Sequence, residues 1–426
     1  SFIIFCLSSY VFFKILKRRY KNFFLSFVGL SLYISSPRIF GDSFFYKDVL
    51  YLSFITFTIY FFLKCMKRMS LKNIILFSLF TALSVNLRVF SFLIPIIFFF
   101  IVTIKCFYLM KPKFILKKSL VYFLCFFIFL FISWPYLWSN PIYNFLDIFS
   151  FFDKDLVNIK ILYNEKYLSN RYLPDTYIFK WIFISSPIGQ NFLFLFGFIL
   201  CASRIYGRLI KIKTNSIYND LWRGRNEETD FILFVFITLF LLLFLLFNAP
   251  LYNGWRLVYF LNIFIVYFAI YFLNFIQIKI IKKYIFSKFF LTFLIFLISF
   301  NYYSIVRYHP FQSIYFNNFL SKNKINGFEG DYHGIGSKDF FERINEMDND
   351  VIINVAVASH TPLHRGLEAL DFKIREKFNV VGQEYKLAKY IYKNNISEVN
   401  SLLNKKYEVP LNFSKIYEKK IGKLII

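Results

Sequence analysis

Two charged residues stand at the end of a predicted membrane span and are the first candidates for chemistry. Arg38 and Asp42 lie four residues apart in SPRIFGDSF. Pro37 ends the preceding helix, and Gly41 allows a sharp turn. Charged groups at a membrane face are costly unless they are paired or functional. Arg38 and Asp42 therefore form either a polar cluster that faces a substrate phosphate or a metal ion, or a local ion pair that anchors the loop.

Arginine and aromatic side chains recur at other predicted span ends. Arg88 lies in VNLRVF. Its guanidinium could bind a lipid phosphate through two hydrogen bonds, or its side chain could simply extend to the lipid head groups. Trp138, in SWPYLWSNP, fits a substrate contact or an interfacial aromatic belt, and belts are common. The segment APLYNGWRLVYF brings together Tyr252, Trp255 and Arg256. This trio suits a sugar ring beside a phosphate, and it also suits an interfacial anchor.

Patterns typical of metal and nucleotide sites are absent from the sequence. The 4 histidines, among them His309 in RYHPFQSIYFN, have no spacing that defines a metal site. The 5 cysteines lie in or beside apolar runs, so they predict neither a zinc site nor a disulfide framework. No nucleotide-binding glycine pattern, GxSxG or HExxH occurs. These absences disfavour a nucleotide-driven pump and a hydrolase of the soluble type.

The composition indicates that these residues work at a membrane. Of the 426 residues, 58% are hydrophobic and 18% are charged, whereas soluble domains average about 45–50% apolar and about 25% charged residues. The net charge is +26. Short basic clusters stand between apolar runs at 14–21, 64–72, 105–118, 204–225 and 279–288. This distribution follows the positive-inside rule, so we interpret the charge as topology and expect no nucleic-acid partner.

Ten apolar runs are candidate spans, for which about 20 residues are typical. They are 1–16, 23–37, 46–63, 74–88, 89–104, 120–137, 187–203, 231–249, 257–275 and 290–304. If all cross and the first runs from outside to inside, every basic cluster falls on the inner side. Two runs, 23–37 and 74–88, are short enough to be re-entrant or tilted. We therefore predict an all-α polytopic membrane domain over residues 1–304.

The same orientation places the loops with candidate residues, and the whole tail, on the outer side. The tail, 305–426, becomes polar and mixed in charge, and we predict a small extracytoplasmic α/β domain. DVIINVAVAS (350–359) predicts a buried strand and the final KKIGKLII a further strand. QEYKLAKYIYKNN (383–395) predicts an amphipathic helix.

The succession of outer segments is similar to that of a known enzyme family. The segments occur in the order SPRIFGDSFFYKD, NLRVFSFLIP, WPYLWSNPIYNF, LPDTYIFKWIFISSP, APLYNGWRLVYF and RYHPFQSIYFN. In this order they resemble the family 39-like glycosyltransferases of the GT-C fold, which include protein O-mannosyltransferases and lipid A aminoarabinose transferases. The resemblance covers roughly residues 1–340 and is carried by loop patterns rather than by one motif.

The resemblance implies transfer of a sugar from a polyprenyl-phosphate donor to a protein, lipid or polysaccharide acceptor on the outer face. A carboxylate would take the proton of the acceptor, and cations would hold the departing phosphate. The implied catalytic positions are Arg38 and Asp42, which organise the pocket. The implied substrate-binding positions, for the donor phosphate, prenyl chain or sugar, are Arg88, Trp138, Tyr252, Trp255, Arg256 and His309.

The resemblance also implies where the main catalytic carboxylate lies. Asp42 takes the place of the family's second acidic motif, but its neighbour is Ser43 rather than a second carboxylate. The sequence therefore assigns no cofactor, and dependence on a divalent cation stays open. Ser1 stands inside an apolar run, and this first run corresponds to the family's second span. We expect the first span, and the loop with the main carboxylate, to precede Ser1. One carboxylate acting alone implies an inverting displacement.

Two other functions remain as alternatives. A carrier or flippase for a lipid-linked sugar typically binds its cargo near the midplane on broken helices, whereas the polar groups here gather at the outer ends of nearly uncharged spans. A non-catalytic scaffold gains weight if the complete chain lacks an acidic first loop. We expect a multi-pass protein of the bacterial inner (cytoplasmic) membrane, surrounded by membrane lipids. Its candidate residues should converge at one mouth that faces outside the cytoplasm.

Overall fold

A computed structural model describes residues 1–45, 47–109, 112–150, 160–210, 221–279, 284–397, 403–422 and 424–425. The chain divides into two compact units. Unit 1 comprises Ser1–Lys154, Ser186–Ala249 and Val258–Arg307, and unit 2 comprises Asp155–Ser185, Pro250–Leu257 and Tyr308–Ile426. Two loops that the sequence assigned to the membrane domain therefore belong to the unit that contains the tail.

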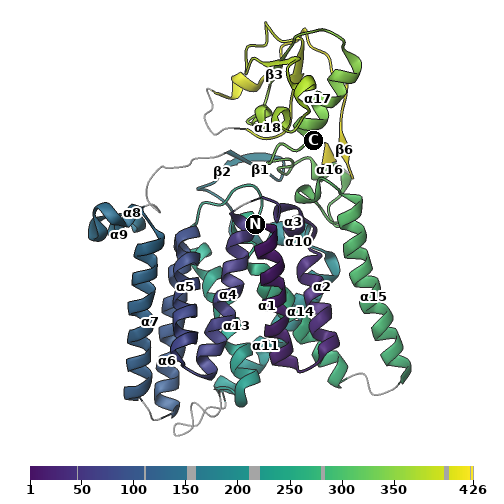
Figure 1. Ribbon diagram of the computed structural model, residues 1–426. Helices are drawn as coiled ribbons and strands as arrows, with labels where there is room; N and C mark the ends of the chain where they lie inside the picture. Colours follow the sequence, from purple (N-terminus) through teal and green to yellow (C-terminus); the bar gives the residue numbers. More distant parts are fainter. Residues whose placement is uncertain are drawn as a thin grey trace. The chain divides into compact units, whose positions relative to one another are not determined.

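Within the described residues, unit 1 is built from ten main helices that run side by side (Figure 1). They are α1 (Phe2–Tyr20), α2 (Phe23–Ile34), α4 (Asp48–Lys67), α5 (Leu71–Leu87), α6 (Leu93–Leu109), α7 (Pro112–Ser133), α11 (Ile188–Ile210), α13 (Gly224–Leu246), α14 (Leu261–Lys279) and α15 (Tyr284–Arg307). Shorter helices between them are α3 (Pro37–Asp42), η1 (Val89–Phe92), α8 (Tyr136–Ser139) and α9 (Pro141–Ser150). Each predicted apolar run overlaps one of the main helices, although several runs extend past the helix ends.

Seven helical stretches of the described chain are long and apolar enough to cross a membrane, which indicates an integral, multi-pass membrane protein. They are α4, Val89–Cys106, Lys113–Ser133, α11, α13, α14 and Ser287–Arg307. The other main helices are α1, α2 and α5. α2 and α5 have 12 and 17 residues, and the last turn of α1 contains three basic residues. For these three helices a membrane crossing stays a prediction.

Local sequence signals set several helix ends in unit 1. The side chain of Asn22 accepts a hydrogen bond from the backbone N–H of Leu25 at 3.2 Å and caps α2. Pro37 is the first residue of α3, where the missing N–H costs no helical hydrogen bond. Lys21 ends α1 with a left-handed φ of 53°. These signals explain why short loops separate α1, α2 and α3.

Aromatic side chains pack several helices of unit 1 against one another. Phe62 of α4 lies edge to face against Phe77 of α5, at 5.3 Å between ring centroids. The same ring packs against Phe98 of α6 at 5.8 Å and against Phe236 of α13 at 5.3 Å. Such pairs contribute about 0.5–1.5 kcal/mol beyond the burial of their area. This packing fixes the helices whose ends carry the charged residues described below.

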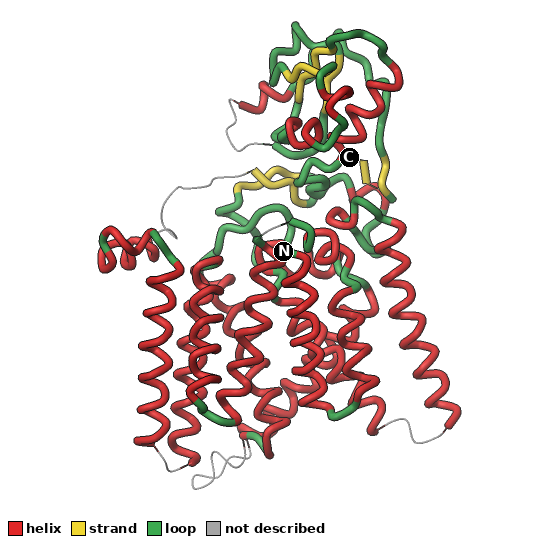
Figure 2. Tube along the Cα trace, in the orientation of Figure 1, coloured by secondary structure: helices red, strands yellow, loops and turns green. Residues whose placement is uncertain are grey.

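Unit 2 contains the strands of the described chain and a set of short helices (Figure 2). Its strands are β1 (Lys160–Tyr163), β2 (Lys166–Ser169), β3 (Ile353–Val357), β4 (Phe378–Val380), β5 (Tyr390–Tyr392), β6 (Lys420–Ile421) and β7 (Leu424–Ile425). Its helices are α10 (Tyr177–Ser185), η2 (Arg256–Val258), which continues into unit 1, η3 (Gln312–Ile314), α16 (Lys322–Ile325), α17 (Gly336–Met347), α18 (Leu363–Glu368), α19 (Phe372–Arg375) and η4 (Leu403–Tyr407).

A parallel sheet in the order β4, β3, β5 organises much of unit 2. Val355 of β3 pairs with Val380 of β4 on one side and with Tyr390 of β5 on the other. Apolar residues of β3 pack with Phe341 and Ile344 of α17 in one buried cluster. Since parallel strands are typically covered on their faces, α17 supplies part of the cover that this sheet needs.

The secondary structure of the tail differs from its prediction at one helix and at the final strand. β3 lies within the strand predicted at 350–359. The single strand predicted over KKIGKLII is instead an antiparallel pair of short strands, β6 and β7. The helix predicted over 383–395 is wrong, because β5 occupies the middle of this segment. The backbone of β5 pairs with β3, and this tertiary pairing overrides the helical spacing of the apolar residues.

Candidate functional site

The first candidate group lies on α3, which connects α2 to α4 in unit 1 (Figure 1). Arg38 is completely buried and Asp42 is only 3% exposed. Residues four apart in a helix lie on the same face, so the two side chains share one face of α3. The carboxylate of Asp42 accepts a hydrogen bond from the hydroxyl of Tyr259 at 2.8 Å. Both charged residues are therefore withdrawn from water and held inside unit 1 rather than exposed at its surface.

Arg88 belongs to the same end of unit 1. Its guanidinium forms an ion pair with Asp48, the first residue of α4. Nearby, the hydroxyls of Tyr51 and Ser91 are hydrogen-bonded at 2.7 Å, and the Tyr51 ring packs against Phe260. We call the following set the α3 cluster: Arg38, Asp42, Asp48, Tyr51, Arg88, Ser91 and Tyr259. Sequence reasoning missed Asp48 and Tyr259, because their partners are distant in the chain.

Trp138 lies apart from the α3 cluster. α8 and α9 stand beyond α7, at the edge of unit 1, whereas α3 lies above α2 and α4 (Figure 1). The Trp138 side chain is 56% exposed, and its indole N–H donates to the carbonyl of Phe131 at 2.7 Å. An exposed indole with a satisfied N–H is typical of an interfacial aromatic belt. The structure therefore favours the anchor interpretation of Trp138.

The second candidate group lies in unit 2. The guanidinium of Arg256 lies over the ring of Tyr252 at 5.0 Å and over the ring of Tyr332 at 5.1 Å. Stacking uses the faces of a guanidinium, whereas its N–H donors lie in its plane. Trp255 is completely buried, so its ring offers no face to a substrate. His309 is exposed, and its Nδ1 is 3.1 Å from Nε2 of Gln312.

Two buried carboxylates of unit 2 escaped the sequence analysis. Glu329 and Asp331, in the segment GFEGDYHGIG, are 2% and 1% exposed. Asp331 accepts a hydrogen bond from the backbone N–H of Gly336 at 2.5 Å, at the start of α17. Burial raises the pKa of the Asp331 carboxyl above its ordinary value. The alternation of acidic residues with glycines and aromatic residues in this segment could have predicted a turn with buried carboxylates.

Charges at the opposite end of unit 1 are bound in ion pairs that the sequence analysis also missed. Asp230, near the start of α13, accepts hydrogen bonds from Arg19 of α1 at 2.7 Å and from Arg204 of α11 at 2.8 Å. Three residues earlier, Glu227 pairs with Arg208 of α11 at 3.1 Å. Two residues before Asp230, Glu228 pairs with Lys105 of α6 at 2.5 Å. The α13 network is the following set: Arg19, Lys105, Arg204, Arg208, Glu227, Glu228 and Asp230. It joins the ends of four helices.

The predicted site residues thus fall into both units. Arg38 and Asp42 share a face of α3, and Arg88 pairs with Asp48 at the same end of unit 1, whereas Tyr252 and Arg256 come together in unit 2. Convergence of the two groups at one mouth stays a prediction. In the part of the chain that the structure describes, no group of three or more His, Cys, Asp or Glu residues is placed to hold a metal ion.

Comparison with known proteins adds no relative. No protein family, curated protein or solved structure matches this chain.

Proposed function

We propose that the chain is a membrane glycosyltransferase that moves a sugar from a polyprenyl-phosphate donor to an acceptor at the outer face of the membrane. The resemblance of the outer loops to family 39-like enzymes names this reaction. The membrane-spanning helices suit a lipid-borne donor, since the prenyl chain is already in the bilayer. The acceptor class, protein, lipid or polysaccharide, remains part of the proposal.

The observation that carries the proposal is the burial of Arg38 and Asp42 on α3. A buried charge at the end of an apolar bundle costs free energy, and such residues usually serve a function. The α3 cluster would supply part of what the reaction needs at its reacting centre, beside the main carboxylate expected before Ser1. Arg38 and Arg88 supply cations for the charge that develops on the departing phosphate. Asp42, held by Tyr259, supplies a fixed carboxylate that orients the acceptor.

For unit 2 we propose a separate recognition role. The aromatic stack on Arg256 holds the guanidinium plane in one orientation. A planar arginine held in this way can donate two parallel hydrogen bonds to a phosphate. Lysine has no such plane, so Arg256→Lys should weaken donor binding although the charge is kept. This result would appear as a higher KM for the donor with little change in kcat.

Transfer from a defined donor tests the proposal directly. The full-length protein, with the segment expected before Ser1, is reconstituted in lipid vesicles with a labelled polyprenyl-phosphate sugar and a protein, lipid or polysaccharide acceptor. Movement of the label from the donor lipid to the acceptor is measured. Asp42→Asn should lower the rate by about 10²-fold, because the carboxylate no longer fixes the acceptor group. Repeating the assay with EDTA shows whether a divalent cation takes part.

Asp147→Asn is the matched control. Asp147 lies on α9, where it accepts a hydrogen bond from Tyr136 at 2.8 Å, outside the α3 cluster. Its removal should leave transfer unchanged. Equal rates for Asp42→Asn and wild type would contradict the proposal. Movement of the intact donor between leaflets, without release of sugar, would instead identify a carrier.

A further inference from the structure

Unit 1 contains a basic pocket at the end that also carries the α13 network. It has a volume of about 510 Å³, within the range of small-molecule sites. Its lining residues are Arg18, Lys21, Lys67, Arg223, Gly224, Arg225, Asn226 and Thr229. Five of these are cations, and no carboxylate lines the pocket within the described residues. The proposed transferase reaction uses none of them.

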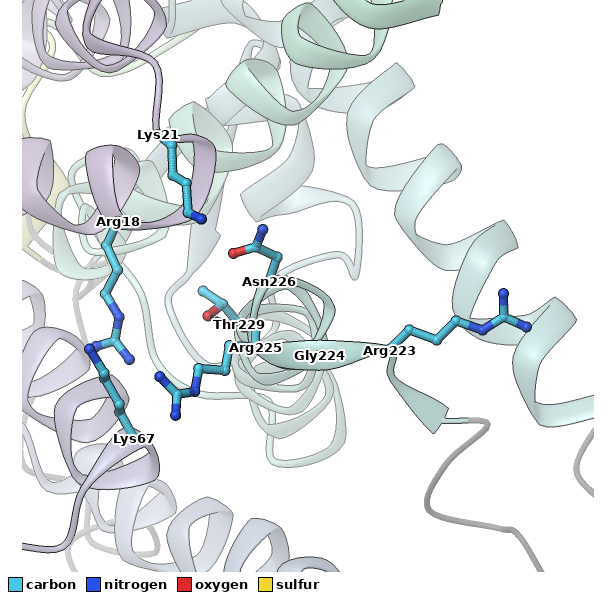
Figure 3. A pocket seen from close by; sticks show the side chains of 8 residues that line it. All are labelled: Arg18, Lys21, Lys67, Arg223, Gly224, Arg225, Asn226 and Thr229. Carbon is cyan, nitrogen blue, oxygen red and sulfur yellow. Dashed lines mark hydrogen bonds between the residues drawn. The ribbon is translucent and has the colours of Figure 1, made fainter.

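The cations of the pocket come from the ends of three helices. Arg18 stands at the end of α1, Lys67 at the end of α4 and Arg225 at the start of α13. Figure 3 shows these three side chains turned toward one another, with Lys21 turned toward Asn226, whereas Arg223 points away. Like charges brought together in this way repel one another. An anion bound between them would attract all three cations and make the net electrostatic energy of the group favourable.

The carboxylates closest in sequence to the pocket are bound mainly by cations outside it, although Glu228 also interacts electrostatically with Arg18. Glu227, Glu228 and Asp230 belong to the first turns of α13, and each is bound to cations of the α13 network. Those cations are not pocket residues. The chain thus neutralises one set of basic side chains at this end of unit 1 and leaves the lining of the pocket positive.

We propose that the basic pocket binds a phosphate group, carried by an anionic lipid or by a soluble phosphate compound. The positive-inside rule places the basic clusters 14–21, 64–72 and 204–225 at the cytoplasmic face. Basic pockets between membrane helices on that face are suited to phosphate-bearing head groups. Arginine and lysine donate charge-assisted hydrogen bonds to phosphate oxygens. The bound phosphate would tie the ends of α1, α4 and α13 together.

Native mass spectrometry of the purified full chain tests this site. Phosphatidylglycerol, phosphatidylcholine or inorganic pyrophosphate is added in detergent, and the retained ligand is measured. The wild type should retain phosphatidylglycerol or pyrophosphate in preference to phosphatidylcholine. Combined Arg18→Gln, Lys67→Gln and Arg225→Gln should weaken retention at least about tenfold, because three charge-assisted contacts are lost. Which of the two anions is retained identifies the lipid or the soluble source.

A control variant removes the same charge elsewhere on the basic end. It combines Lys14→Gln, Lys72→Gln and Lys117→Gln, three exposed residues outside the pocket. It should keep the ligand. Single Lys67→Gln, at an exposed position, provides a milder variant if the triple variant does not fold, and it should also weaken retention. Equal losses in pocket and control variants, or full retention by both pocket variants, would overturn the proposal.

Discussion

Buried charged residues stabilise the packing of the helix ends in unit 1. Asp230 is completely buried and accepts hydrogen bonds from Arg19, Arg204 and the hydroxyl of Tyr267. In these contacts, the Asp230 carboxylate supplies the negative charge that both guanidinium groups bind. Taking it away would leave two partly buried cations without compensation. The cost of such a change exceeds that of losing a surface ion pair.

Asp230→Asn should therefore destabilise the protein strongly. We expect the free energy of unfolding to fall by about 3–5 kcal/mol, the range for breaking a buried pair. Denaturant titration of the full chain in mixed micelles measures the change. Glu227→Gln is the control on the same helix, because its pair with Arg208 is partly exposed, and it should cost about 1 kcal/mol or less. Equal effects of the two substitutions would refute the special role of Asp230.

Residue spacing predicted some of these groups and could not predict others. Arg38 and Asp42 are one helical turn apart, so local sequence was enough to pair them as one candidate site. The partner of Asp42 is Tyr259, 217 residues further along the chain. Helix packing alone determines which hydroxyl meets a carboxylate at such a separation. The partners of Asp230 were missed for the same physical reason.

Helices α11 and α14 show how one small residue sets the approach of two elements. A Cβ atom added at Gly197 of α11 would lie 1.8 Å from the backbone oxygen of Phe268 on α14. No real carbon atom fits at that distance, and the atom in its way belongs to backbone. Small residues are typical of membrane-helix interfaces because they allow backbones to approach closely. Gly197 therefore fixes the spacing between α11 and α14.

Gly197→Ala should force these helices apart and destabilise the protein by about 1–3 kcal/mol, the usual cost of overpacking. Gly207 lies on the same helix, and a Cβ atom there would meet nothing within 4 Å. Gly207→Ala should leave stability unchanged or raise it by up to about 1 kcal/mol, because alanine favours helix. Denaturant titration of both variants compares them. A stable Gly197→Ala protein would disprove the close contact.

Runs of apolar residues predicted the main helices of unit 1 better than the spacing of apolar residues predicted the secondary structure of the tail. A run of apolar residues reports a property that one segment has by itself, and each of the ten runs overlaps one main helix. The segment 383–395 has helical spacing, yet Tyr390–Tyr392 joins a sheet. A three-residue strand is stabilised by its neighbour β3 rather than by its own sequence. Such an element cannot be found from local pattern alone.

At the scale of unit 1 as a whole, polar groups gather at its two ends and the helices between them are apolar. The α3 cluster lies at one end, and the α13 network with the basic pocket lies at the other (Figure 1). The proposed reaction needs the α3 cluster on the outer side, and the proposed phosphate site needs the pocket on the inner side. Both proposals therefore require α4, which joins the two ends, to cross the membrane.

Cysteine labelling in intact cells tests this arrangement. In a variant without native cysteines, single cysteines replace Phe44, Lys72 and Tyr143, all of them exposed residues. A membrane-impermeant maleimide should label Phe44→Cys and Tyr143→Cys from outside, and Lys72→Cys only after permeabilisation. Because α5, α6 and α7 lie between positions 72 and 143, labelling of Tyr143→Cys from inside would mean that short α5 does not cross. Labelling of Phe44→Cys and Lys72→Cys from the same side would mean that both proposed sites face one compartment. This result would contradict a donor site outside and a phosphate pocket inside.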